Sequence, residues 1–149
     1  MLTKSLPARR QVGLTLIELM VVVAVIAIIT TLALPGLQNA SKRSNEASAI
    51  ASLKNILTAQ NQYKIRFGSF ASVSDLVTAD LLDDNFSDDE KSGYRFQNVS
   101  APTIGNWELE AVPVNPSASG DRYFFVDSSG VIRFKDGVQA GDGDTPVDS

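Results

Sequence analysis

Residues 14–34 read LTLIELMVVVAVIAIITTLAL, an apolar stretch of 21 residues in which Glu18 is the only charged residue. At about 1.5 Å per residue, a helix of this length is roughly 31 Å long, which matches the hydrocarbon thickness of a bilayer. The stretch is too long for one buried strand, and only a helix satisfies its own backbone hydrogen bonds in lipid. The sequence therefore predicts a single helix that can span a membrane.

Charged residues are distributed unevenly on the two sides of this apolar stretch. The segment before it, residues 1–13, contains three basic residues and no acidic residue. Residues 36–74 contain five basic residues and one acidic residue, whereas residues 75–149 contain 15 of the 17 acidic residues. The chain thus has a basic N-terminal segment, an apolar segment, a second basic segment and an acidic C-terminal part. This order is typical of a membrane-anchored protein whose charge changes along its length.

The composition excludes several classes of function. The chain of 149 residues contains no cysteine and no histidine, which excludes disulfides, thiolate zinc sites, cysteine nucleophiles and histidine-based catalysis. The net charge of -4 argues against a general nucleic-acid binder. A chain of this length corresponds to one domain, so we expect one globular head and no catalytic residues.

A plain signal anchor and a cleaved secretory signal peptide both begin with basic residues followed by an apolar stretch. Against the signal peptide, the apolar stretch is longer than usual and runs into Pro35 and Gly36 without a small-x-small cleavage site. A plain anchor fits the length alone. However, an unpaired carboxylate inside an apolar segment costs a few kcal/mol, so we expect Glu18 to have a charged partner.

Residues 9–13, RRQVG, followed by residues 14–29, LTLIELMVVVAVIAII, resemble the class III signal of type IV prepilins and type II secretion pseudopilins. The shared features are a short basic leader, a glycine, an apolar first residue, a glutamate five residues after the glycine and an unbroken apolar helix. The resemblance implies that prepilin peptidase cleaves after Gly13 on the cytoplasmic side, leaving residues 1–13 as a leader, and that the new amino group of Leu14 is methylated. The family usually has phenylalanine at this first mature position, so Leu14 departs from its pattern.

The resemblance also implies roles for Glu18 and for the end of the apolar stretch. Glu18 matches the carboxylate that pairs with the amino terminus of a neighbouring subunit during assembly, and such a pair fixes the register of buried subunits. Many members of the family carry a proline at the position of Pro35. Pro35 and Gly36 permit a kink, because proline removes one backbone hydrogen bond. The segment 14–35 is therefore the expected transmembrane and filament-core helix.

A second helical pattern occupies residues 36–68. Its apolar residues recur at steps of three and four, which predicts an amphipathic helix that ends at Gly68. The recurring positions are Ala47, Ile50, Leu53 and Leu57, which form an apolar stripe along the helix. Ile56, Tyr63 and Phe67 widen this stripe. We expect this apolar stripe to pack on a sheet. The residues that follow the helix, 69–92, resemble the variable loop of the family.

Four segments with alternating side chains predict an antiparallel sheet within a head of residues 93–139. They are residues 91–99, 107–114, 122–126 and 131–134, with a turn at 127–130. We expect one face of the sheet to pack on the apolar stripe of the helix, which makes an α+β head. The resemblance implies the pilin fold, in which a long helix packs on a four-stranded sheet. Many pilins close the C-terminal part of the head with a disulfide, which this chain cannot form.

Two acidic segments contain candidate calcium ligands, because calcium binds to clustered oxygen atoms such as those of carboxylates. They comprise Asp83, Asp84, Asp88, Asp89 and Glu90 in the first, and Asp142 and Asp144 in the second. Neither segment has EF-hand spacing, and we interpret both as solvated surface, with calcium as the alternative. Glu108 and Glu110 share one face of a predicted strand and are expected to keep that face soluble. Residues 140–149 predict a mobile acidic tail.

The leading hypothesis is a structural subunit of a type IV pilus-like filament, and not an enzyme. Its expected partners are prepilin peptidase, identical or related pilin subunits, the inner-membrane assembly platform with its ATPase, and the membrane before assembly. No nucleic-acid partner is inferred. We expect a single-pass precursor in a prokaryotic inner membrane, with its head in the periplasm or outside. The alternatives are the major pseudopilin of a type II secretion system and a monomeric membrane-anchored binding module.

Overall fold

The computed structural model describes residues 13–86 and 89–147, with the backbone alone at 32–35. The chain divides into two compact units, Met1–Leu37 and Gln38–Ser149, and we call the second unit the head. One long helix, α1 (Leu16–Phe67), supplies the helical structure described in the first unit and continues into the head.

Helix α1 passes through Pro35 and Gly36 without ending. Proline lacks a backbone N–H, so one hydrogen bond of the helix is missing at this point, yet the helix continues on both sides. The sequence pattern divides this region into residues 14–35 and 36–68, whereas the structure assigns both to one helix. It ends beside Gly68, whose φ of +80° only glycine adopts without strain. The kink at Pro35 and Gly36 stays a prediction.

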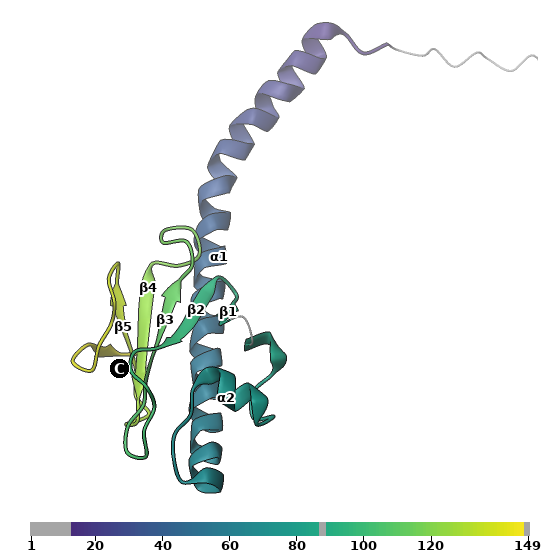
Figure 1. The fold of residues 1–149 in the computed structure, drawn as a ribbon. Coiled ribbons are helices and arrows are strands. Elements are labelled where there is room, and N and C mark those ends of the chain that lie inside the picture. Colours follow the sequence, from purple (N-terminus) through teal and green to yellow (C-terminus); the bar gives the residue numbers. More distant parts are fainter. Residues whose placement is uncertain (1–12, 87–88, 148–149) are drawn as a thin grey trace, which may run out of the picture. The chain divides into compact units, whose positions relative to one another are not determined.

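The head contains a six-stranded antiparallel sheet in which each strand pairs with the next along the chain (Figure 1). Its central strands are β2 (Tyr94–Asn98), β3 (Glu108–Pro113), β4 (Arg122–Asp127) and β5 (Ile132–Asp136). Two-residue strands, β1 (Glu90–Lys91) and β6 (Thr145–Pro146), lie at the two edges. The α+β fold is therefore confirmed. The sheet is wider than predicted, because a two-residue strand leaves no alternation to recognise.

The segment between α1 and the sheet, predicted as a variable loop, contains the short helix α2 (Val73–Thr78) and the 3-10 turn η1 (Asp84–Phe86). The buried Gln60 side chain holds the start of this segment against α1. Its amide nitrogen donates to the Ala71 carbonyl (2.6 Å), and its amide oxygen accepts from the Ala71 N–H (3.0 Å). A buried amide satisfied on both sides fixes the direction in which the chain leaves α1.

The core of the head lies between α1 and one face of the sheet (Figure 1). Leu53 and Ile56 are fully buried in it, as the predicted stripe requires. Ala47, however, is exposed, and Ile50 is only half-buried. The buried face of α1 differs from the predicted apolar stripe. Polar residues of α1 are also buried, and a pattern of apolar residues does not predict them. The largest buried side chains of the head are Trp107, Tyr94, Phe86, Phe96, Phe124, Leu53, Ile56, Leu76 and Leu109.

The segment predicted as a mobile tail, residues 140–149, includes a paired strand. Thr145 and Pro146 pair with β5, and the Val147 N–H donates to the Ile132 carbonyl (2.9 Å). The Lys135 ammonium also lies 3.2 Å from the Asp144 carboxylate. A Gly- and Asp-rich composition favours mobility, but it does not reveal these contacts with the neighbouring strand. Residues 144–147 are therefore attached to the edge of the sheet.

Gly120 lies against the Tyr94 hydroxyl, which donates to the Arg122 carbonyl at 2.8 Å. Burial raises the pKa of Tyr94 well above its usual range, so the hydroxyl stays protonated as a donor. A Cβ on Gly120 would lie 2.0 Å from the Tyr94 oxygen. We expect Gly120→Ala to lower the free energy of unfolding by about 1–3 kcal/mol, as overpacking does.

Fluorescence of the single tryptophan, Trp107, during urea unfolding in detergent measures this loss, because Trp107 is buried in the head. The control is Gly105→Ala, because nothing lies within 4 Å of a Cβ built on Gly105. Equal unfolding curves for the two variants would contradict the close contact between Gly120 and Tyr94.

Candidate functional site

The residues around the predicted cleavage point precede the helix. Gly13, Leu14 and Thr15 are not helical, and α1 begins at Leu16. A Cβ built on Gly13 would meet nothing within 4 Å. The described structure therefore gives no packing reason for glycine at this position, so a requirement for glycine would have to come from another molecule.

Glu18 lies in the first turn of α1 and forms two hydrogen bonds with Thr15. The Glu18 N–H donates to Thr15 Oγ1 (3.3 Å), and the Thr15 N–H donates to Glu18 Oε2 (3.5 Å). This reciprocal arrangement is a capping box, which satisfies two N–H groups that a helix start leaves without partners. The spacing Thr-x-x-Glu before an apolar run is the sequence signal for such a cap, and it would have predicted the role of Thr15 as well as that of Glu18.

The apolar side chains before and after Glu18 in the sequence do not pack inside the protein. Ile17, Met20, Ile28 and Ile29 are each at least 60% exposed. The helix is long and apolar enough to cross a membrane. A helix that is apolar around its circumference requires lipid or other apolar surfaces as its surroundings.

A second polar site lies in the head, where Glu46 of α1 meets Asp121 and Arg122 at the start of β4. The Glu46 side chain is 7% exposed, and its Oε2 pairs with the Arg122 Nε at 2.8 Å. Its Oε1 accepts from the N–H groups of Asp121 (3.0 Å) and Arg122 (3.3 Å). The sequence predicts no role for Glu46 beyond its charge.

Replacing Glu46 with alanine is expected to lower the free energy of unfolding of the head by about 3 kcal/mol, the lower end for a broken buried ion pair. The lower end applies because Arg122 is partly exposed. Urea unfolding followed by Trp107 fluorescence measures this change. The matched control is Glu90→Ala, which removes an exposed pair with Arg95 and should cost less than about 1 kcal/mol. Equal losses in the two variants would show that Glu46 does not hold the loop.

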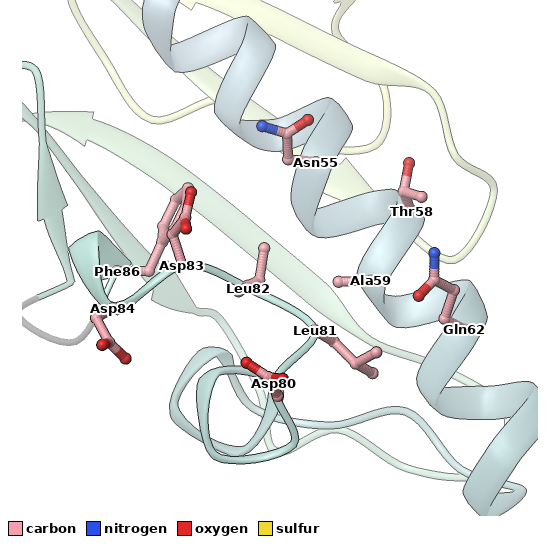
Figure 2. A pocket seen from close by; sticks show the side chains of 10 residues that line it. All are labelled: Asn55, Thr58, Ala59, Gln62, Asp80, Leu81, Leu82, Asp83, Asp84 and Phe86. Atoms are coloured by element: carbon pink, nitrogen blue, oxygen red, sulfur yellow. The ribbon is translucent and has the colours of Figure 1, made fainter.

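Asp83 and Asp84 of the first acidic segment lie in one wall of an open groove. In Figure 2, the side chains of Asn55, Thr58 and Gln62 on α1 lie across from the segment that carries Asp80 and Asp83. Asp88 lies outside the described residues. Within residues 13–86 and 89–147, no three acidic residues come close enough to hold a metal ion. The groove is thus a polar surface without a metal-binding arrangement among the described residues.

Of the remaining acidic residues, Asp144 and Glu110 have protein partners. The Gly141 N–H, which donates to the Asp144 carboxylate (2.8 Å), and the Lys135 ammonium hold the pKa of Asp144 below its usual range. Asp142 is exposed. Glu110 was expected to be exposed, and this prediction is wrong. It is 8% exposed, because the loop after β5 covers it and Gln139 donates to its carboxylate at 3.2 Å.

The residues around the candidate site match a known sequence motif. The prokaryotic N-terminal methylation motif matches residues 8–34, the region that contains Gly13, the capping box and the exposed apolar helix. The matched residues lie entirely within the N-terminal part of the chain. Gly13, Leu14 and Glu18 all lie within the matched residues.

Two curated proteins are similar in sequence to part of this chain. The type IV wide pilus major component PilA4 of Thermus thermophilus is 39% identical over 64 residues, which cover 43% of this chain and 49% of that protein. The type IV major pilin protein PilA of Myxococcus xanthus is 41% identical over 66 residues, which cover 42% of this chain and 30% of that protein. The chain thus spans half or less of the length of these relatives. The similarity is to structural pilins and not to enzymes.

Proposed function

We propose that this chain is the precursor of a structural subunit of a type IV pilus-like filament. The observation that carries the proposal is the methylation motif over residues 8–34. In this motif a glycine and a short non-helical segment precede an exposed apolar helix. The similarity to two major pilus components supports the same function.

Processing is the first step of the proposed function. Prepilin peptidase cleaves between Gly13 and Leu14 and methylates the new amino group of Leu14. The bond lies before the first residue of α1, between two residues that are not helical. Cleavage there leaves the apolar helix on the mature subunit.

Polymerisation is the second step. The precursor spans the inner membrane once, and the assembly platform with its ATPase moves the processed subunit into the filament. There the apolar side chains of α1 exchange lipid for neighbouring pilin subunits, which keeps their surface away from water. The Glu18 carboxylate then requires a cation in an apolar surrounding, and the amino terminus of an adjacent subunit supplies it.

Surface filaments sheared from cells test the proposal. An immunoblot against the head should detect the chain in the sheared fraction, and deletion of the gene should remove both the band and the filaments. Filaments that persist unchanged after deletion would overturn the proposed function.

A major pseudopilin of a type II secretion system is the second candidate. It is favoured by the absence of cysteine, because many pilins close the head with a disulfide. Loss of protein secretion after gene deletion, with surface filaments intact, would support this candidate over the first.

A further inference from the structure

Two aspartate residues in the C-terminal part of the head are each followed by a glycine. They are Asp136, which precedes Gly137, and Asp142, which precedes Gly143. An aspartate carboxyl group lies close to the amide nitrogen of the next residue, and a glycine has no Cβ to shield that nitrogen. Because the two pairs have the same local chemistry, a difference in their reactivity has to come from the folded structure.

The first pair is held by the sheet. Asp136 is the last residue of β5 and lies opposite Arg122 of β4. The Gly137 N–H donates to the Asp121 carbonyl at 2.9 Å. An amide nitrogen that is bonded in this way, in a backbone fixed by a neighbouring strand, is not free to turn toward the carboxyl group of the residue before it.

The second pair lies at an exposed turn. The Asp144 N–H donates to the Gly141 carbonyl at 3.2 Å, which places Asp142 and Gly143 at the two central positions of the turn. Both residues are exposed, and neither the Asp142 carboxylate nor the Gly143 N–H bonds to any part of the chain that the structure describes. A Cβ built on Gly143 would meet nothing within 4 Å. The two reacting groups are therefore accessible to each other and to water.

We propose that Asp142 is a site of isoaspartate formation and that the fold protects Asp136 from the same reaction. The Gly143 nitrogen attacks the Asp142 Cγ and forms an N–Cγ bond, and the hydroxyl of the carboxyl group leaves with the amide proton as water. Water then opens the resulting cyclic imide at either carbonyl. One opening restores aspartate, and the other gives isoaspartate, in which the main chain runs through Cγ. No other reactant is needed, and the mass of the product equals that of the starting chain.

Isoaspartate lengthens the main chain by one methylene group inside the turn. Two hydrogen bonds span the altered link, from the Asp144 N–H to the Gly141 carbonyl and from the Gly141 N–H to the Asp144 carboxylate (2.8 Å). Strand β6 follows the turn directly, and beyond it the Val147 N–H donates to the Ile132 carbonyl. We therefore expect β6 to separate from β5 more often in the modified chain.

The test uses the full-length chain in detergent micelles, kept for several weeks near neutral pH in water enriched in heavy oxygen. Each opening of the imide adds a heavy oxygen atom to the aspartate concerned, and peptide mass spectrometry locates that atom. Labelling at Asp142 should exceed labelling at Asp136 severalfold, and peptide fragmentation should show isoaspartate at Asp142. Equal labelling at the two positions, or an unlabelled Asp142, would overturn the inference.

A matched pair of variants tests the attacking nitrogen. Gly143→Val should remove most of the labelling at Asp142, because a branched side chain shields the nitrogen that attacks. Gly141→Val places the same side chain before Asp142, where there is also open space, and should leave the labelling unchanged. Trp107 fluorescence verifies that both variants are folded. Equal labelling at Asp142 in the two variants would show that the Gly143 nitrogen is not the attacking group.

Unfolding separates the effect of the fold from that of the sequence. In guanidinium chloride the protection of Asp136 should be lost, and the two aspartates should be labelled to a similar extent. If Asp136 stays unlabelled in the unfolded chain, its protection does not come from the fold and the inference fails. Faster amide exchange of Val147 in the fraction that contains isoaspartate would support the effect on β6, and unchanged exchange would contradict that effect. The inference concerns the head alone, so its outcome is independent of the proposed function.

Discussion

Glu18→Ala is expected to abolish filament assembly while the processed subunit accumulates in the membrane. The substitution makes the apolar segment more apolar, so insertion should persist, and the leader is unchanged, so cleavage after Gly13 should persist. Assembly should fail because the amino terminus of each neighbouring subunit would lose its carboxylate partner in an apolar surrounding. An uncompensated charge in such a place costs several kcal/mol.

Immunoblots of sheared filaments and of membranes from wild-type and Glu18→Ala cells measure this effect. The matched control is Thr30→Ala, which removes a polar side chain from the same helix. The Thr30 hydroxyl donates to the Ile26 carbonyl of its own helix at 2.8 Å, so its loss should leave filaments near the wild-type level. Abundant filaments from Glu18→Ala would refute the pairing role of Glu18.

Gly13→Val should block processing, and the unprocessed precursor should accumulate in the membrane. The described structure has open space around Gly13, so the side chain itself should not disturb the fold. A protease subsite that admits the backbone closely, in contrast, excludes a branched side chain. Without cleavage, no free amino terminus forms at Leu14, and filaments should be absent.

The size of the subunit on a gel and its N-terminal sequence measure processing. Gly105→Val is the matched control, because it introduces the same side chain at a glycine that also has open space. It should be processed normally. Trp107 fluorescence of the Gly13→Val precursor should match that of wild type, which would separate a processing defect from a folding defect. Normal processing of Gly13→Val would contradict cleavage at this bond.

The parts of the fold with long repeated patterns could be predicted from the sequence. The 21-residue apolar stretch determines a helix, and four alternating segments determine the four central strands. These signals are strong because each repeats over many residues. The edge strands β1 and β6 could not be predicted, because pairing of two residues depends on the neighbouring strand and not on a local pattern.

The polar contacts were the least predictable part of the molecule. Glu46 and Glu110 have the same side chain as the exposed Glu90, and only the arrangement of donors around them explains why they are buried. The partner of Glu46 lies 76 positions along the chain, so no local pattern reveals it. The Thr15–Glu18 cap, by contrast, spans three positions and was readable from its spacing.

The mass and N-terminal sequence of the subunit in sheared filaments test the central claim most directly. The account predicts a chain that begins at Leu14, carries a methyl group on its amino terminus and lacks residues 1–13. Filaments composed of a chain that still begins at Met1 would contradict it.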